Sequence, residues 1–223
     1  MQPAQIERPK SKGKLFLLQV ALIVTAGWWV FWPALWGNWL WDDGLLIAQN
    51  PVVQDPAGLW KIWFEPGMLV DYFPLNVSVE WLEWQLWPND PFGYHLLTLI
   101  FHLVDSLLVW RLLAKFGLRF AWLGGLLFAI HPVVVESVAW IAELKNTLSL
   151  LPFLLALCCW IDYERHPNRK DYFWALGLFI AAMLCKTTMV MFPVVILLYA
   201  WWKRGWIGWN DAKVSSPFFA VSP

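Results

Sequence analysis

The stretch LFLLQVALIVTAGWWVFWPALW, residues 15–36, runs for 22 positions without a charged side chain. A helix of that length rises about 33 Å, enough to cross the roughly 30 Å hydrocarbon layer of a bilayer. The whole chain shares this character, since 60% of its 223 residues are hydrophobic and only 14% are charged. Soluble domains are about one quarter charged. The sequence therefore predicts an integral membrane protein that starts with an uncleaved transmembrane helix.

Five further apolar runs follow the first one, and they predict an all-α fold with about six transmembrane helices. They cover residues 92–113, 120–141, 146–163, 172–185 and 188–202. The chain is thus divided into a basic N-terminus (1–14), a first helix (15–36), a loop (37–91), a bundle (92–204) and a tail (205–223). The tail looks truncated, because it ends on an apolar stretch too short to cross a membrane.

Basic residues fall mostly on one side of this arrangement. With six spans, that side collects Arg8, Lys10, Lys12, Lys14, Lys115, Arg119, Arg165, Arg169, Lys170, Lys203, Arg204 and Lys213. The other side holds Lys61 and Lys145, with Lys186 near the membrane edge. The positive-inside rule then predicts a cytoplasmic N-terminus and an outward loop 37–91. We favour a bacterial inner membrane, with the endoplasmic reticulum membrane as the equivalent in a eukaryote.

The loop over 37–91 is rich in acids and tryptophans. Its segments GLWKIWF (58–64) and VSVEWLEWQLW (77–87) carry tryptophans at three- and four-residue intervals, which predicts short amphipathic helices at the membrane interface. For any single tryptophan, the alternative is an aromatic belt that only anchors the protein. The acids of the loop are Asp42, Asp43, Asp55, Glu65, Asp71, Glu80, Glu83 and Asp90.

Two adjacent carboxylates, Asp42 and Asp43, follow the first span. An acidic pair at this place can simply be a solvated loop. A carboxylate at the bilayer surface could instead accept a proton from a hydroxyl acceptor or bind a metal. Close pairing would raise one of the two pKa values, which suits a base. We take the pair as the candidate catalytic group, of which one member suffices because chain neighbours rarely face the same way.

Four more ionisable residues gather on the predicted outer side: His131, Glu136, Lys145 and Lys186. Pro132 breaks or kinks the third span, so His131 and Glu136 lie in or near the membrane, where such groups usually face protein or a water-filled cavity. Lys186 could meet a phosphate or reach back to the headgroups. The region around His131 could equally be a helix-ending loop with locally satisfied polar groups. Glu143 and Lys145 could form a simple interfacial pair.

Few features indicate a bound cofactor. His95 and His102 share one helical face and could ligate a haem, but they would serve different ligands and no other predicted helix offers a matching histidine. A hydrogen-bonded pair of His102 with Asp105 is expected instead. The three cysteines lie in apolar runs without metal-ligand spacing. No metal ligand is assigned, a metal requirement stays open, and the net charge of zero predicts no nucleic-acid partner.

The chain contains no nucleotide-binding loop and no serine-nucleophile motif. Six strings occur in order: WDDGLLIAQNP (41–51), GLWKIWFEPG (58–67), DYFPL (71–75), WLEWQLWPNDPFGYHLLTLIFH (81–102), LFAIHPVVVESVAWIAELKNTLS (127–149) and CKTTMVMFPVVILL (185–198). Together they resemble the membrane part of the transmembrane and tetratricopeptide-repeat glycosyltransferases. That family has the GT-C fold and includes eukaryotic protein O-mannosyltransferases and bacterial relatives.

The resemblance implies a membrane transferase that moves a sugar from a polyprenyl-phosphate donor to a protein hydroxyl on the outer face. It implies that Asp42 or Asp43 acts at the acceptor. It also implies a donor-phosphate site lined by His131, Glu136, Lys145 and Lys186. The arginine that usually precedes the lysine at position 145 is Leu144 here, so one bidentate phosphate donor is missing.

The resemblance further implies a longer protein, because members continue with more spans and then helical repeats. Half a bundle would expose polar inner faces to lipid, which is unfavourable. The chain is therefore expected to be the N-terminal part of a transferase or to complete itself against other membrane subunits. The alternative function is a non-catalytic, transferase-like subunit that acts as a scaffold in a larger membrane complex. Membrane lipids and a protein acceptor on the outer side are also expected as partners.

Overall fold

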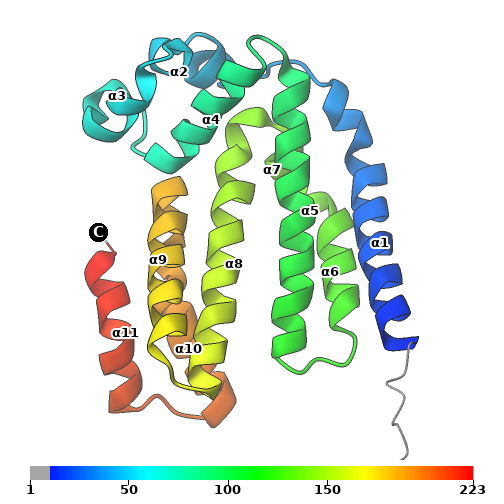
Figure 1. The fold of residues 1–223 in the computed structure, drawn as a ribbon, viewed down its shortest axis with the longest axis vertical. Coiled ribbons are helices and arrows are strands. Elements are labelled where there is room, and N and C mark those ends of the chain that lie inside the picture. Colours follow the sequence, from blue (N-terminus) through cyan, green and yellow to red (C-terminus); the bar gives the residue numbers. More distant parts are fainter. Residues whose placement is uncertain (1–10, 223) are drawn as a thin grey trace, which may run out of the picture.

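The computed structural model describes residues 11–222 as a bundle of helices with no β-strand in that range. In Figure 1 the long helices stand side by side, and a group of short helices covers one end of them. We call this end, which carries residues 37–90, the loop end. At the opposite end, residues 116–120, 166–168 and 205–208 join consecutive helices. The predicted all-α membrane bundle is confirmed, while Arg8 and Lys10 of the basic N-terminus lie outside the described residues.

The helices are divided between the bundle and the loop end. The bundle contains α1 (Ser11–Phe31), α5 (Pro91–Lys115), α6 (Ala121–Ile130), α7 (Val135–Ala139), α8 (Leu144–Arg165), α9 (Arg169–Cys185), α10 (Phe192–Arg204) and α11 (Trp209–Val221). The loop contains α2 (Pro51–Gln54), α3 (Gly58–Phe64) and α4 (Pro74–Leu86). Tighter or wider turns connect them: η1 (Trp32–Trp36), η2 (Gly44–Ala48), η3 (Pro66–Met68), η4 (Pro132–Val134), η5 (Ile141–Glu143) and η6 (Thr187–Met191).

Polar caps and prolines determine where several helices begin. The side chains of Asn50 and Asp90 accept hydrogen bonds from backbone N–H groups in the first turns of α2 and α5. Each cap is followed by a proline, which has no N–H to leave unpaired at a helix start. The end of α10 is also determined by its sequence. Its cap residue, Gly205, has a left-handed backbone with a φ of 82°, a conformation that glycine adopts at little energetic cost.

The apolar runs of the sequence match the membrane-spanning helices closely. Three described helices are long and apolar enough to cross a bilayer: Gly13–Trp36, Pro91–Lys115 and Ile141–Arg165. The predicted break at His131-Pro132 is present, since α6 and the segment Pro132–Ala139 meet at 49° and together could form a fourth crossing. The predicted fifth span lies within α9, of 17 residues, whereas the predicted sixth span begins in η6 and continues into α10, of 13 residues. The count of six crossings stays a prediction.

Close packing holds the spanning helices together. Lipid tails are as apolar as leucine, so burial against a neighbouring helix brings little hydrophobic gain and tight contact matters more. The helix α8 is central, since 61% of the most apolar part of its span is buried, against 17% for α1 at the edge. Small residues allow close approach, because a Cβ added to Gly125 of α6 would lie 2.8 Å from the carbonyl oxygen of Ser106 in α5.

The short helices predicted in the loop are present as α3 and α4. Their tryptophans mostly hold the loop together. The indole Nε1 of Trp63 donates to Ser78 Oγ at 3.0 Å, that of Trp81 donates to the carbonyl oxygen of Asp55 at 2.8 Å, and Trp84 is buried. Trp60, by contrast, is 65% exposed. Anchoring alone therefore does not explain this group of aromatic residues.

Two further features differ from what the sequence suggested. The residues 205–223 contain α11, and the ring of Phe218 on this helix is fully buried against Phe179, Phe192 and Trp160. The assignment of that segment to the cytoplasm stays a prediction. The expected bond between His102 and Asp105 was wrong: His102 Nε2 lies 3.0 Å from the carbonyl oxygen of Ala129, and the Asp105 carboxylate has no hydrogen-bond partner among residues 11–222.

Candidate functional site at the loop end

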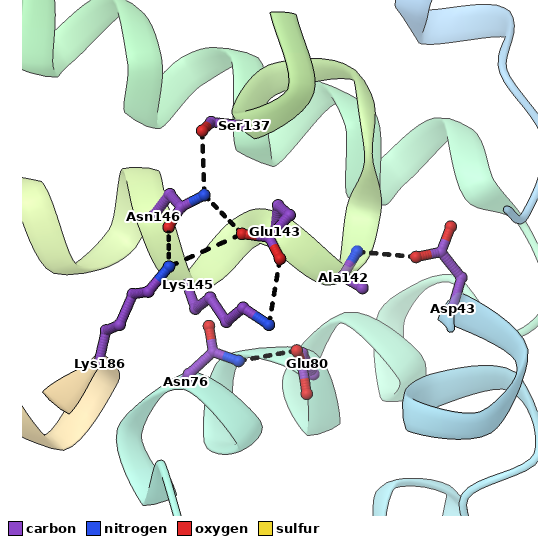
Figure 2. Close-up of polar contacts among 9 residues, drawn as sticks. All are labelled: Asp43, Asn76, Glu80, Ser137, Ala142, Glu143, Lys145, Asn146 and Lys186. Atoms are coloured by element: carbon purple, nitrogen blue, oxygen red, sulfur yellow. Dashed lines mark hydrogen bonds and ion pairs between the residues drawn. The ribbon is translucent and has the colours of Figure 1, made fainter. Parts of the chain in front are cut away.

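The Asp43 carboxylate ties the loop to the bundle. One of its oxygens accepts a hydrogen bond from the backbone N–H of Leu40 and the other from that of Ala142, both at 2.8 Å. The residue is fully buried, and this burial raises the pKa of its carboxyl group while the two backbone donors act in the opposite direction. Ala142 lies 99 residues after Asp43 in the chain, so the Asp43 carboxylate joins two distant segments at the loop end (Figure 2).

Asp42 has the opposite environment. Its side chain is exposed, and only its backbone carbonyl takes part in the local turn, where it accepts a bond from Leu46. The residue just before the pair, Trp41, has a φ of 37°, which is left-handed and unusual for a bulky residue. The two neighbouring carboxylates therefore point to different surroundings, one into protein and one away from it, as expected from their adjacency in the chain.

Two of the four predicted phosphate-site residues come together around Glu143. The Nζ of Lys145 lies 3.2 Å from Glu143 Oε1, and the Nζ of Lys186 lies 3.8 Å from Oε2 (Figure 2). All three side chains are only 15–23% exposed. Lys186 is the residue after α9 and Glu143 precedes α8, so the cluster forms where these two helices reach the loop end.

An amide completes this cluster. Asn146 Nδ2 donates to Glu143 Oε2 at 2.5 Å and to Ser137 Oγ at 3.0 Å, while its Oδ1 accepts from Lys186 Nζ. One side chain thus links α7, α8 and the end of α9 (Figure 2). Two ammonium groups against one carboxylate leave the Lys145–Glu143–Lys186 cluster with one formal positive charge. That balance suits a monoanion such as a phosphodiester.

His131 and Glu136 are not part of this cluster. Both are exposed, His131 at the end of α6 and Glu136 in α7. The Nδ1 of His131 accepts a hydrogen bond from the backbone N–H of Val133, so this side chain caps the turn η4. This contact agrees with the alternative of a helix-ending loop whose histidine is satisfied locally. The side chain of His131 is exposed, so its Nε2 is left for another role.

The sequence reasoning missed two buried acids on α4. Glu80 and Glu83 are 4% and 1% exposed, although the sequence places both among the acids of an outer loop. Burial raises the pKa of Glu80 to about 8 and that of Glu83 well above its usual value. Asn76 Nδ2 donates to Glu80 Oε1 at 2.7 Å, and a cavity of about 30 Å³, room for about one water, lies between Glu80 and Lys145.

A signal for these acids was present in the sequence. Asn76, Glu80 and Glu83 are spaced by four and three residues, which places them on one face of a helix. The spacing predicts a shared polar face, but it does not tell whether that face meets water or protein. In the fold, α4 lies across the ends of α8 and α9, and its polar face is covered. Among the described residues, no group of three or more histidine, cysteine or acidic side chains could hold a metal ion.

Residues 79–220 match the family model described as dolichyl-phosphate-mannose-protein mannosyltransferase. The chain belongs to this family. The matched range begins within α4, after the Asp42–Asp43 pair, and includes the break at His131-Pro132 and the Lys145–Glu143–Lys186 cluster. It ends within the last turn of α11. The GT-C resemblance drawn from the six strings is thereby confirmed at the level of the family.

Curated relatives match most of the chain. The chain is 30% identical over 205 residues to the human protein O-mannosyl-transferase TMTC1. This alignment covers 80% of the chain and 23% of the human protein. The chain is 28% identical over 213 residues to the Caenorhabditis elegans protein O-mannosyl-transferase F38B6.6, with 85% and 29% covered. The chain thus spans about a quarter of the length of these relatives. No solved structure matches it.

Proposed function

We propose that this mannosyltransferase-family chain forms the face on which a sugar, mannose by analogy with the relatives, passes from a polyprenyl-phosphate donor to a protein hydroxyl. The observation that carries the proposal is the arrangement at the loop end. There the exposed carboxylate of Asp42 is next to Asp43, which is bonded to Ala142. The residue after Ala142 is Glu143, around which the ammonium groups of Lys145 and Lys186 gather. Both groups lie at one end of the membrane helices, where a lipid-linked donor would present its phosphate.

Asp42 is the member of the acidic pair that we assign to the acceptor. Its carboxylate would take the proton of a serine or threonine hydroxyl while the hydroxyl oxygen bonds to the anomeric carbon of the sugar. The bond from that carbon to the phosphate oxygen breaks in the same process, and polyprenyl phosphate leaves with its electron pair. Asp43 is a positioning residue, since both of its oxygens are already occupied by backbone donors.

Lys145 and Lys186 are assigned to the donor phosphate. Glu143 and Asn146 hold the two ammonium groups in place, so the cluster is pre-organised before a donor arrives. A leaving phosphate gains negative charge, which positive groups at fixed positions stabilise. His131 and Glu136 would reach the donor from the exposed side of the α6–α7 break. The outward orientation of this face belongs to the proposal on the grounds of the charge bias. The bacterial inner membrane belongs to it on the grounds of the overall resemblance.

The test is a transfer assay with the purified 223-residue chain, a polyprenyl-phosphate mannose donor and an acceptor peptide that contains serine and threonine. Asp42→Asn is expected to lower kcat by at least about 100-fold with an unchanged thermal unfolding temperature, because a lost general base typically costs that much. Asp43→Asn is expected to lower the unfolding temperature together with the activity. Lys186→Gln is expected to raise the KM for the donor more than it lowers kcat.

Full activity of Asp42→Asn would overturn the assignment of the acceptor carboxylate. Loss of activity in Asp43→Asn at an unchanged unfolding temperature would transfer that role to Asp43. The scaffold alternative makes a different prediction, since a wild-type chain that turns over no donor but co-purifies in fixed stoichiometry with other membrane proteins would support it. Turnover by the isolated chain excludes that alternative.

A further inference from the structure

A second polar pocket lies at the opposite end of the molecule, away from the candidate site. Its volume is about 430 Å³, and its lining comes from α5, α8 and α10 near the points where these helices end. The lining residues are Lys115, Phe116, Arg165, Tyr199, Trp202 and Lys203. Three of the six are cations and three are aromatic, and none of them belongs to the proposed transfer site.

The three cations of this pocket differ in how far their charge is neutralised by partners within the protein. Lys115 forms an ion pair with Asp162, and one amino group of Arg165 donates to the carbonyl oxygen of Lys115 at the end of α5. A guanidinium has five N–H donors, so most of those on Arg165 remain for a ligand. Lys203 has no carboxylate partner among the described residues and lies 5.6 Å from the ring centroid of Tyr199. The pocket therefore keeps about two unneutralised positive charges.

The aromatic residues give the pocket a rigid floor. The rings of Phe116 and Tyr199 are stacked with centroids 5.6 Å apart, and Trp202 meets Phe116 edge-on at the same separation. Tyr199 is buried whereas Trp202 is 62% exposed, so the wall continues outward from the helix bundle. Tryptophan and tyrosine concentrate at the level of lipid headgroups, and lysine and arginine there attract anionic lipids.

A second surface with similar chemistry lies along α5. A groove of about 450 Å³ between α1 and α5 is lined by aliphatic and aromatic side chains with Arg111 near the end of α5. The exposed faces of α10 next to the pocket are apolar, with Leu198 and Trp202 more than half exposed. A molecule that fits the pocket thus needs an anionic head at the helix ends and a hydrocarbon part along the helices.

From this charge complementarity we infer that the pocket of Lys115, Arg165 and Lys203 binds the phosphate headgroup of an anionic phospholipid, with the acyl chains lying along α5 and α10. The three helix C-termini carry partial negative charge, which the cations must also offset. The charge that remains is positive and of the order of one unit or less, which favours a singly charged phosphodiester over a more highly charged anion. By the predicted orientation the site faces the cytoplasmic leaflet, opposite the proposed transfer site, and its test does not depend on transferase activity.

Native mass spectrometry of the intact 223-residue chain in detergent tests this inference. Phosphatidylglycerol and phosphatidylcholine with identical acyl chains are titrated separately, and bound lipid is counted for each variant. One basic residue near the surface changes the affinity for an anionic lipid about five-fold. We expect Lys203→Gln to weaken phosphatidylglycerol binding about five-fold, and Lys203→Gln with Arg165→Gln to weaken it about 25-fold, with little change for phosphatidylcholine.

The matched control is Lys213→Gln, which removes one positive charge from an exposed lysine on α11 that does not line the pocket. It is expected to change phosphatidylglycerol binding less than two-fold, and Lys203→Arg is expected to keep it. Equal binding of the two lipids would overturn the inference, as would an equal loss in the control. Competition by millimolar inorganic phosphate as strong as that by the lipid would identify a soluble-anion site instead and would also overturn it.

Discussion

At the scale of single residues, the neighbouring carboxylates of Asp42 and Asp43 show what a sequence can and cannot specify. Composition and position mark the pair as a candidate, because two acids directly follow a long apolar run. Which of them faces the solvent depends on the backbone N–H of Ala142, and no local pattern encodes a contact over 99 residues. The same holds for Glu80, whose burial follows from where α4 comes to lie.

The stability of the protein should fall as pH rises because of Glu80. Its pKa is about 8 in the folded state against about 4.5 when unfolded. Between these values the folded state keeps a proton that the unfolded chain has released, so the free energy of unfolding drops by up to about 1.4 kcal/mol per pH unit. Glu80→Gln should flatten the fall of the thermal unfolding temperature between about pH 5 and pH 8.

The control for that measurement is Glu65→Gln, the same change at an exposed acid of the same loop. It should leave the pH dependence of the unfolding temperature as in the wild type. An identical pH profile for Glu80→Gln and wild type would mean that Glu80 is ionised in the folded protein and that the Asn76 amide and nearby Lys145 outweigh its burial.

At the scale of elements, most of the fold could be predicted, because long apolar runs have few alternatives in a bilayer. The segments 92–113 and 146–163 lie within α5 and α8, and Pro132 marks the break before α7. The interior of the bundle was less predictable. His102 is bonded to the carbonyl oxygen of Ala129 because the chain turns back and sets α6 beside α5, which spacing along α5 alone does not reveal.

The contact of α5 with α6 should depend on Gly125. A methyl group there would lie 2.8 Å from both the carbonyl oxygen of Ser106 and the Cβ of Trp110, so the two helices would have to separate. We expect Gly125→Ala to destabilise the protein by about 1–3 kcal/mol, the usual cost of overpacking. Thermal unfolding followed by tryptophan fluorescence measures the effect.

Gly177 provides the matched control for this substitution. It lies in α9, and a Cβ added to it would meet nothing within 4 Å. Gly177→Ala should leave the unfolding temperature unchanged or raise it slightly, since alanine favours helix by up to about 1 kcal/mol over glycine. Equal effects of the two changes would show that packing between α5 and α6 does not limit stability.

At the scale of the whole molecule, the two ends of the bundle have different chemistry. The loop end holds the acidic pair and the cluster around Glu143, whereas the opposite end holds Lys115, Arg165 and Lys203. The predicted orientation rests on the larger number of basic residues on the side of the opposite end, because basic residues stay on the cytoplasmic side. Hydropathy and charge thus predicted the layout, and the contacts within each end required the structure.

The orientation predicts a clear labelling pattern. Ala57→Cys, at an exposed position of the loop end, should react with a membrane-impermeant maleimide in intact cells. His166→Cys, at an exposed position of the opposite end, should react only after the membrane is permeabilised. The native cysteines lie inside helices of the bundle, so the wild type serves as the unlabelled background. The reverse pattern would invert the topology and with it the leaflets assigned to both sites.

The bond between Asp43 and Ala142 also has a consequence for the order of events during synthesis. Asp43 leaves the ribosome 99 residues before its partner does. At about 5–20 residues per second, that interval lasts roughly 5–20 s. The loop end therefore cannot adopt its final form while only the first span has been inserted. The segment around Asp43 has no partner until the segment around Ala142 has been made. The nascent loop is exposed to proteases and chaperones throughout that time.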